Sequence, residues 1–533
     1  MTLLLNRAAA LVVLSLLACL APAAVMAETP VQVWAVESPG HAGPGSGQPG
    51  CGAVPYAQRA MAIDSGGNSY VTGCSSNGSN SDYRTVKYDP SGAVLWTARY
   101  NGTGNNTDVA YALAVDADDN VLVTGYSIGS SGGYNYATVK YASDGTPLWV
   151  QTYNGTGNNY DYANALAVDA SGNVLVTGQS YNGTSYDYAT VKYASDGTPL
   201  WVQTYNGTGN NTDVAYALAV DASGNVLVTG QSVGSSGTNY ATVKYASDGT
   251  PLWVQTYNGT GNSTDQATAL AVDASGNVLV TGYSIGSSGN YDYATVKYAS
   301  AAGTPLWVKT YNGTGNNHDY ATALAVDASG NVLVTGRSYS SSGNDDYATV
   351  KYASAAGTPL WVQTYNGTGN YYDYANALAV DAGGNVLVTG YAYNGSSNDY
   401  ATVKYASDGT PLWVQTYNGT GNGYDAAYAL AVDANNNVLV TGRSRNSSGN
   451  DDYATMKYAS DGTQLWISDV VVESQRPERL STSVGARKMV VDAAGNTCVA
   501  GSGFNGRNDD YRVAKFDVAG TLVWSATYKR HRQ

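Results

Sequence analysis

A repeating unit of about 53 residues constrains this chain more than any other feature, because a fixed period across most of a sequence dictates a repeat architecture. Each unit contains an aspartate before a short polar turn and a tryptophan 32 to 34 residues later. The aspartates are Asp64, Asp116, Asp169, Asp221, Asp273, Asp327, Asp381, Asp433 and Asp492. Nine such units fill the chain from Cys51 to Tyr528, which predicts one large repetitive domain.

Four short segments in each unit predict β-strands. In the third unit they read ANALAV (163–168), VLVTG (174–178), YATVKY (188–193) and LWVQTY (200–205). They are rich in Val, Thr, Tyr and Trp, and Asp, Asn, Gly or Pro bounds each one, which is typical of strands joined by tight turns. The Ala-rich first segment suits a crowded central axis, and the fourth, which follows Pro199, suits an outer edge.

A four-stranded sheet repeated around an axis is a β-propeller. The predicted fold class is therefore all-β, a propeller of about nine four-stranded blades. Nine exceeds the usual four to eight blades, so an eight-bladed ring with one displaced unit is the alternative.

Two segments carry a family resemblance. The unit AVDASGNVLVTG (167–178), followed by an Asp- and Tyr-rich loop and a Trp strand, resembles the bacterial SBBP-type β-propeller repeat in all nine copies. The segment SDGTPLW (195–201) also resembles the tryptophan-docking turn of quinoprotein propellers. The resemblance implies an exported propeller and no single shared activity.

The N-terminal region predicts export. Residues 1–27 combine Arg7, an apolar run and small residues before Glu28, as a signal peptide does. The alternative is a lipobox that would make Cys19 the lipidated first residue. Residues 28–50 form a Pro- and Gly-rich segment whose VQVWAV (31–36) resembles a ring-closing strand, and 51–533 form the propeller. No later stretch could span a membrane, so we expect a periplasmic, cell-surface or secreted protein.

Composition excludes several function classes. A net charge of −14 and a pI near 4.5 disfavour binding to nucleic acid. With only three histidines, the chain cannot form a multi-His metal site, and most His-dependent catalysis is disfavoured. Cys51 and Cys74 are predicted to form a disulfide, with two free thiols as the alternative, and Cys498 is predicted to be a core residue.

Differences among the nine copies predict where a ligand would bind. The turns between strands 1 and 2 and between strands 3 and 4 are nearly constant, whereas the 2–3 and 4–1 loops vary and contain Tyr, Ser, Gly, Asn and Asp. Propeller geometry places these variable loops on one face, and their composition is typical of binding loops. The alternative is unconstrained drift of loop tips. The candidate ligand-binding residues are Tyr160, Asp161, Tyr186, Asp187, Tyr372, Asp373, Asp399, Asp425 and Asp452.

Repeated carboxylates could hold calcium or could cap their own turns. Asp116, Asp118 and Asn120 resemble the start of a calcium loop, although the glycine and the distal glutamate of such a loop are missing. Capping of the turn by hydrogen bonds to backbone amides is the favoured interpretation. The predicted cofactor set is therefore none, with Ca²⁺ as the only possibility.

Catalysis by a repeated residue is disfavoured, because an active site is set apart by its neighbours. A lysine recurs in every third strand, for example Lys192, and is predicted to be the structural partner of an aspartate. An enzyme site would have to lie in an irregular segment, of which Ser468–Lys488 is the best candidate, and a solvated loop where the ring closes is the favoured interpretation. The chain also lacks the adjacent cysteine pair of a quinoprotein dehydrogenase.

The sequence thus predicts an exported, monomeric, non-enzymatic β-propeller whose variable face binds an extracellular or envelope protein or glycan. The alternatives are a quinoprotein-like or polysaccharide-acting enzyme and a structural surface protein stiffened by calcium.

Overall fold

The computed structural model describes residues 61–66, 68–76, 80–89, 93–130, 132–235, 237–433, 435–447, 451–470, 485–492, 494–504 and 509–528. The chain divides into two units, 1–33 and 34–533, and every described residue belongs to the second unit. These residues form 36 strands in nine four-stranded sheets, with no helix among them. The predicted all-β propeller of nine blades is therefore confirmed. The predicted signal peptide, Cys19, the strand at 31–36 and Cys51 lie outside the described residues.

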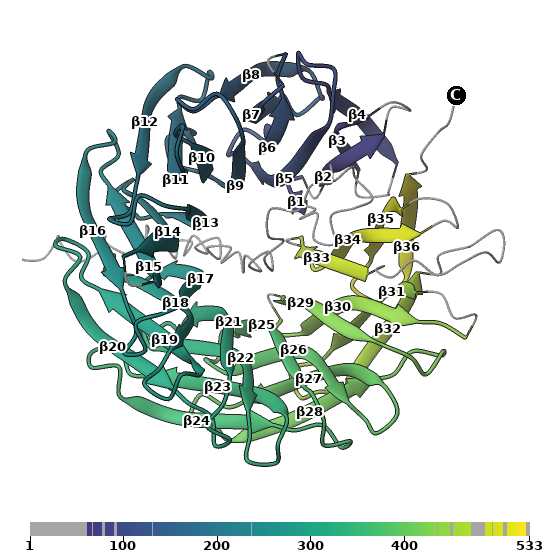
Figure 1. The fold of residues 1–533 in the computed structure, drawn as a ribbon. Coiled ribbons are helices and arrows are strands. Elements are labelled where there is room, and N and C mark those ends of the chain that lie inside the picture. Colours follow the sequence, from purple (N-terminus) through teal and green to yellow (C-terminus); the bar gives the residue numbers. More distant parts are fainter. Residues whose placement is uncertain are drawn as a thin grey trace, which may run out of the picture. The chain divides into compact units, whose positions relative to one another are not determined.

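Each blade has a strand near the central axis and a second strand beside it (Figure 1). The first strands are β1 (Met61–Ile63), β5 (Asp108–Val115), β9 (Asp161–Val168), β13 (Asp213–Val220), β17 (Asp265–Val272), β21 (Asp319–Val326), β25 (Tyr374–Val380), β29 (Ala426–Val432) and β33 (Gly485–Val491). The second strands are β2 (Ser69–Ser76), β6 (Val121–Ile128), β10 (Val174–Tyr181), β14 (Val226–Gly234), β18 (Val278–Ile285), β22 (Val332–Tyr339), β26 (Val386–Tyr393), β30 (Val438–Arg445) and β34 (Thr497–Phe504).

The third strand follows outward, and the fourth forms the circumference of the ring (Figure 1). The third strands are β3 (Ser81–Tyr88), β7 (Tyr134–Tyr141), β11 (Tyr186–Tyr193), β15 (Gly237–Tyr245), β19 (Tyr291–Tyr298), β23 (Asp345–Tyr352), β27 (Asn398–Tyr405), β31 (Asp451–Tyr458) and β35 (Asp509–Phe516). The fourth strands are β4 (Val94–Tyr100), β8 (Pro147–Tyr153), β12 (Pro199–Tyr205), β16 (Pro251–Tyr257), β20 (Pro305–Tyr311), β24 (Pro359–Tyr365), β28 (Pro411–Tyr417), β32 (Gln464–Val470) and β36 (Leu522–Tyr528).

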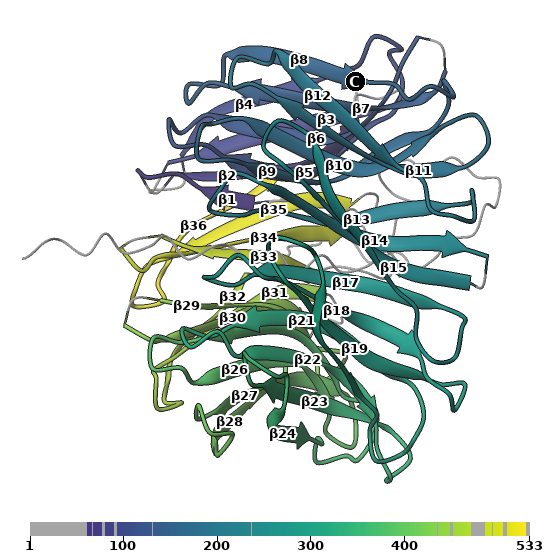
Figure 2. The same ribbon diagram turned by 90° about the vertical axis from the view of Figure 1, so that its left-hand side faces the viewer.

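The strands run across the thickness of the ring, so their connections gather on two faces (Figure 2). We number the blades 1 to 9 in chain order. The turn face carries the 1–2 and 3–4 turns, and the loop face carries the 2–3 and 4–1 loops. Contacts between the two kinds of loop confirm that they share a face: Gly157 N–H of a 4–1 loop donates to the carbonyl of Tyr181, where a 2–3 loop begins, at 3.0 Å.

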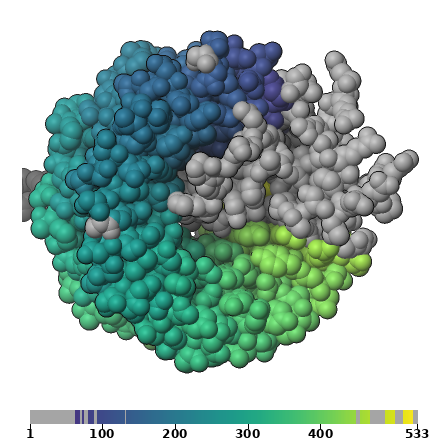
Figure 3. Space-filling view, in the orientation of Figure 1, coloured from purple at the N-terminus to yellow at the C-terminus, as the bar shows by residue number. Residues whose placement is uncertain are grey.

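The ring closes by packing between blades 9 and 1. Strand β33 contacts β1, and Val86 of blade 1 belongs to one core cluster with Val490 and Cys498 of blade 9. Blade 9 has four strands of its own, so closure needs no strand from elsewhere. Cys498 is fully buried, which confirms the predicted core position. In the space-filling view, blades 2 to 7 also pack against one another without an open gap (Figure 3).

A β-bulge in the first strand explains the glycine that ends each VLVTG segment. In blade 3 the pairing of β9 with β10 shifts between Thr177 and Gly178, which leaves Asn164 as the extra residue. A Cβ atom on Gly178 would lie 1.9 Å from the carbonyl oxygen of Tyr162, so only glycine fits there. The bulge turns the Asn164 side chain toward blade 4, where its amide donates to the Ala215 carbonyl at 2.9 Å.

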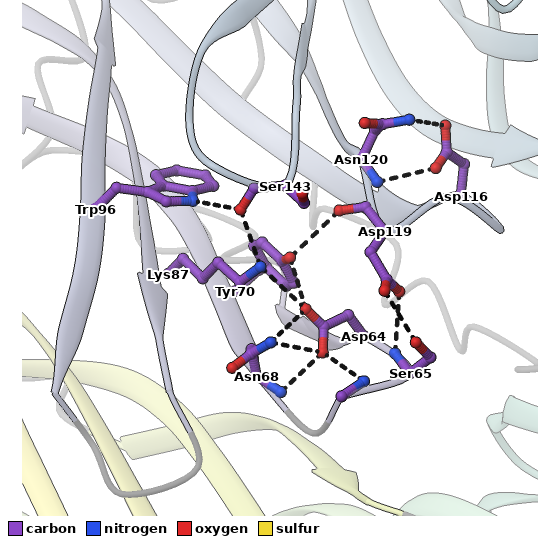
Figure 4. Close-up of polar contacts among 11 residues, drawn as sticks. Asp64, Ser65, Asn68, Tyr70, Lys87, Trp96, Asp116, Asp119, Asn120 and Ser143 are labelled. Carbon is purple, nitrogen blue, oxygen red and sulfur yellow. Dashed lines mark hydrogen bonds and ion pairs between the residues drawn. The ribbon is translucent and has the colours of Figure 1, made fainter.

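On the turn face, a lysine and a tryptophan join each of blades 1 to 7 to the next blade. Figure 4 shows this junction between blades 1 and 2, where Lys87 pairs with Asp64 at 3.1 Å. Lys87 Nζ and Trp96 Nε1 both donate to the carbonyl of Ser143 in the next blade, each at 2.9 Å. The two contacts therefore link a blade's own 1–2 turn to its neighbour's 3–4 turn.

The same buried ion pair recurs in all nine blades and confirms the predicted structural role of the lysines. The pairs, at 2.8 to 3.1 Å, are Lys87–Asp64, Lys140–Asp116, Lys192–Asp169, Lys244–Asp221, Lys297–Asp273, Lys351–Asp327, Lys404–Asp381, Lys457–Asp433 and Lys515–Asp492.

Candidate functional site

An aspartate before or at the start of the first strand holds each 4–1 loop in place. Asp161 is fully buried, and its carboxylate accepts the N–H groups of Gly155 and Tyr181, each at 2.9 Å, and the Ser180 hydroxyl at 2.6 Å. Asp373 and Asp425 are also fully buried and accept two backbone N–H groups each. A ligand could reach these three carboxylates only if the loop above them opened.

The next two candidate aspartates lie on third strands, and Asp187 shares a cross-strand row with Asp161 through Ser180. Asp187 is 6% exposed and accepts from the Asn182 amide at 2.8 Å and the Ser185 hydroxyl at 3.3 Å. Asp399 has the equivalent contacts with its own 2–3 loop. These two carboxylates thus position loops. Asp452 pairs with Ser444 in the ladder of blade 8, and its side chain is outside the described residues.

The candidate tyrosines are more accessible than the aspartates. Tyr160 and Tyr372 are each 38% exposed, and Tyr186 is half-buried. Tyr160 lies in the loop before blade 3 and packs against Tyr134 of blade 2 in a tilted arrangement, with ring centroids 4.8 Å apart. Tyr371 beside Tyr372 is 52% exposed. These aromatic rings, rather than the carboxylates, form the accessible part of the candidate site.

Aromatic and guanidinium groups connect Tyr371 and Tyr372 into a row across blades 5 to 8. The tyrosine row consists of Tyr283, Tyr291, His318, Tyr320, Arg337, Tyr371, Tyr372, Tyr374, Tyr391, Tyr393, Tyr424 and Arg443. Adjacent rings lie 4.4 to 6.5 Å apart between centroids, within the usual range for aromatic pairs. The row contains members of four blades and so is a property of the assembled ring.

Arg337 is the central member of the tyrosine row. Its guanidinium lies 4.2 Å from the ring centroid of Tyr320 and 4.7 Å from that of Tyr374, so it is stacked between blades 6 and 7. Nη1 also donates to Asp345 at 3.0 Å and to the Tyr374 hydroxyl at 2.9 Å. These contacts fix the orientation of the rings on either side.

The sequence contains a signal for this row that loop comparison misses. The residue after VLVTG differs between copies that are otherwise nearly identical. In blades 2 to 8 it is Tyr126, Gln179, Gln231, Tyr283, Arg337, Tyr391 and Arg443. The side chain at this position contacts the start of the following blade, as in Tyr126 with Tyr162 at 5.3 Å and Tyr391 with Tyr424 at 5.4 Å. The varying residue after VLVTG, inside an otherwise constant second strand, is therefore the sequence signal for the tyrosine row.

The predicted calcium residues lie on the opposite, turn face. One oxygen of Asp116 accepts the N–H groups of Asp118 and Asn120, and the other pairs with Lys140 at 2.9 Å. The Asn120 amide also donates to Asp116 at 3.1 Å. Protein donors thus contact both carboxylate oxygens, as expected of a cap. Among the described residues, no group of three or more His, Cys, Asp or Glu side chains is placed to hold a metal ion.

The predicted disulfide falls partly outside the described residues. Cys51 is not described, and Cys74 is described only through its backbone in β2, where it pairs with Tyr83. The irregular segment is described only at its ends, 468–470 and 485–488. The described part of the chain contains no helix long and apolar enough to cross a membrane.

Carboxyl groups of the loop face are held in surroundings that favour the neutral form. Burial raises the pKa of Asp373 and Asp425 to about 6, from an ordinary value of 3.8, although backbone N–H groups oppose the change. Burial likewise raises the pKa of Asp292 and Asp346 to about 6. No ion pair described for the chain includes any of these four residues.

No protein-family model matches the sequence, and no curated protein matches it significantly. Solved structures do resemble it. BamB from Moraxella catarrhalis is 13% identical with a TM-score of 0.40, covering 79% of this chain and 96% of its own. A structure described as the eukaryotic initiation factor is 10% identical with a TM-score of 0.48, covering 87% and 97%. Quinohemoprotein alcohol dehydrogenase ADHIIG from Pseudomonas putida HK5 is 13% identical with a TM-score of 0.44, covering 89% and 75%.

Likeness at such low identity concerns fold alone, and with TM-scores below 0.5 it carries no argument about activity. The nine sheets themselves therefore define the class of protein, a nine-bladed β-propeller. Its resemblance to SBBP-type repeats stays a prediction.

Proposed function

We propose that this protein is an exported recognition module that binds a glycan through the tyrosine row. The observation that carries the proposal is the exposure of the Tyr371 and Tyr372 rings on the loop face. Large exposed apolar side chains of the described residues belong mostly to the circumference of the ring, and Tyr160, Tyr371 and Tyr372 are the ones in the 4–1 loops.

The chemistry around these rings suits a sugar. Tyrosine supplies a rigid, amphipathic surface with few rotatable bonds, so that little conformational entropy is lost on binding. The neighbouring loops supply amides and hydroxyls, including Thr368 and Asn394, which already contact each other across two loops. A surface of flat rings and neutral polar groups matches the apolar faces and hydroxyl edges of a carbohydrate chain.

Export and the absence of catalysis are part of the proposal. Residues 1–27 support export because they have the organisation of a signal peptide. Repetition supports binding, because the row spreads a surface over four blades and distinguishes no single reactive group. We also propose that the chain belongs with bacterial SBBP-type propellers, on the strength of its nine AVDASGNVLVTG-like units.

The test is a binding screen of residues 28–533 against purified envelope glycans and surface proteins, with Ca²⁺ and with chelator. We expect saturable binding to a glycan, weakened about tenfold or more in the double variant Tyr371→Ala/Tyr372→Ala, because each ring contributes roughly 1 kcal/mol or more. Calcium dependence would show whether a metal ion takes part.

A matched control is available on the circumference. Leu360 and Val362 of β24 are 52% and 40% exposed, similar to Tyr371 and Tyr372, but lie on an outer strand. The double variant Leu360→Ala/Val362→Ala should bind as the unmodified protein does. Equal loss in both double variants, or binding to proteins and to no glycan, would contradict the proposal.

A further inference from the structure

A row of polar side chains crosses each blade beneath the 2–3 loop. In blade 5, Asp265, Ser284 and Asp292 are paired across β17, β18 and β19, so their side chains share one face of the sheet. The 2–3 loop starts directly after this row, and Gly286 lies two residues after Ser284. The strand-3 member of the row is therefore covered by the loop.

The copies show how the strand-3 residue is matched to its loop. Where the loop residue two places after the row is Asn or Ser, the strand-3 residue is Asp. These pairs are Asn182 with Asp187, Ser340 with Asp346, Asn394 with Asp399 and Asn446 with Asp452. Where the loop residue is Gly, the strand-3 residue is Asn, as in Gly129 with Asn135 and Gly234 with Asn239. In these copies the third strand carries an acid where the loop side chain can donate a hydrogen bond. It carries a neutral amide where the loop residue is glycine.

The contacts show the reason for this match. The side-chain amides of Asn182 and Asn394 donate to Asp187 and Asp399 at 2.8 and 2.6 Å. Such amide donors stabilise an ionised carboxylate, which would otherwise be buried without compensation. In blade 6 the Ser340 hydroxyl contacts Ser342 and Asn344, and Asp346 Oδ1 has no hydrogen-bond partner.

Blade 5 breaks the rule, because it combines Gly286 with Asp292. Asp292 is 9% exposed, and its Oδ1 has no hydrogen-bond partner. Its Oδ2 lies against the loop, 2.5 Å from where a Cβ on Gly286 would be. The loop position that carries the donating amide of Asn182 in blade 3 and Asn394 in blade 7 therefore carries only a hydrogen atom here.

The titratable groups around Asp292 do not compensate its charge. Asp319 of blade 6 repels the ionised form, and Asp265 lies in the same row. The charge of Asp292 also contributes to the raised pKa of Tyr257 of blade 4. His318 contacts the end of the loop, where its Nδ1 accepts the Tyr291 N–H at 3.2 Å.

We propose that Asp292 makes the blade 5 loop acid-responsive: it binds a proton in mildly acidic solution, and the neutral carboxyl then holds loop 286–290 more firmly than the carboxylate does. A proton on the Asp292 carboxyl neutralises the charge that a loop donor would otherwise compensate, and Gly286 offers no such donor. The neutral carboxyl is also no longer repelled by Asp319. The inference concerns loop stability and does not depend on the proposed function.

The size of the response follows from linkage. Burial and the charge of Asp319 raise the pKa of Asp292 to about 6. When the loop opens, the carboxyl returns to an ordinary pKa near 3.8. Lowering the pH from about 7 to about 5.5 should therefore shift the closed-to-open equilibrium about fourfold toward the closed loop.

Hydrogen exchange measured by mass spectrometry on residues 28–533 tests this. Protection of the 286–291 amides, corrected for intrinsic exchange, should rise about fourfold from pH 7 to pH 5.5. Asp292→Asn reproduces the pairing of blades 2 and 4 and should abolish the rise. Gly286→Asn reproduces the Asn446–Asp452 pair of blade 8, which has the same spacing, and should give high protection at both pH values.

Two controls separate other sources of the response. Asp187→Asn changes the same position in blade 3 and should leave the rise in loop 286–291 unchanged, as should His318→Gln. No rise in the unmodified protein, or a rise that survives Asp292→Asn, would overturn the proposal. Protection by Ca²⁺ at pH 7 that is lost in Asp292→Asn, without a response to protons, would also overturn it and identify a cation as the occupant.

Discussion

The two faces of the propeller carry the same acidic residue in opposite surroundings. On the turn face, Asp221 pairs with Lys244 at 2.9 Å, and the pair is buried to a few per cent exposure. On the loop face, Asp213 of the same blade is fully buried and accepts only hydrogen bonds, from Gly207 N–H at 2.6 Å and Val233 N–H at 2.9 Å among others. One aspartate is compensated by a cation, and the other is not.

This difference moves the two pKa values in opposite directions. Burial would raise the pKa of Asp221, but hydrogen bonds from Asn225 and Lys244 outweigh it and lower the pKa. Burial raises the pKa of Asp213, and hydrogen bonds only moderate the change. The ion pairs of the constant turn face fix the blades to one another. The loop face tolerates different loops, because its buried aspartates can hold each loop in the neutral or in the ionised form.

The largest expected effect is a stability maximum in mildly acidic solution. Five loop-face carboxyls have a pKa raised to about 6: Asp108, Asp292, Asp346, Asp373 and Asp425. A raised folded-state pKa gives stability that is lost as the pH rises through 6, so acidification from pH 7 to 5 should gain about 1 kcal/mol per carboxyl. The lysine-paired aspartates of blades 1 to 8 have lowered pKa values, and their contribution should be lost only below about pH 4.

Denaturant unfolding from pH 3 to 8, followed by circular dichroism, measures this profile. We expect the free energy of unfolding to be greatest near pH 5. A flat profile between pH 5 and 7 would show that the loop-face carboxyls are compensated after all, and the contrast between the faces would disappear.

The next effect compares one substitution on the two faces of blade 4. Asp221→Asn leaves Lys244 buried without its counter-charge, which should cost about 3–5 kcal/mol at neutral pH. Asp213→Asn leaves no charge unpaired and weakens one hydrogen bond to the 4–1 loop, which should cost about 1–2 kcal/mol.

Both variants keep the size of the side chain, so the shift in the denaturation midpoint reports charge and hydrogen bonding. The double variant Asp221→Asn/Lys244→Met removes both charges and should recover part of the loss. Equal losses in the two single variants would argue against distinct roles for the two aspartates.

The turn face could be predicted from the sequence and the loop face only in part. Lys192 and Asp169 recur without change, so a structural pair was a direct inference from repetition. Asp161 recurs just as regularly, but a carboxylate under a loop and one facing solvent look alike in sequence. The NGTGN loop folds back over Asp161, and that fold decides its role.

The tyrosine row was missed for a related reason. Its contacts join residues of adjacent blades, such as Arg337 and Tyr374, that are 37 positions apart in the chain. The sequence shows that the residue at this strand position varies between blades. Only the arrangement of the blades in the propeller shows that these side chains contact the next blade.

The smallest expected effect compares two glycines with positive φ. Gly249 of the turn face has φ 89°, and a Cβ there would lie 2.7 Å from the Trp201 ring. Gly183 of the loop face has φ 106°, and a Cβ there would meet nothing within 4 Å. Both positions disfavour alanine through backbone strain, but only the first adds overlap with a packed ring.

Gly249→Ala should therefore cost about 2–4 kcal/mol and Gly183→Ala about 1–2 kcal/mol in thermal unfolding at constant pH. The larger cost should also come with weaker docking of Trp201, whose Nε1 donates to Ser247 in the neighbouring blade at 3.1 Å. Similar melting shifts for both variants would mean that strain alone governs these glycines. The turn face would then owe its constancy to the ion pairs and not to the tryptophan contact.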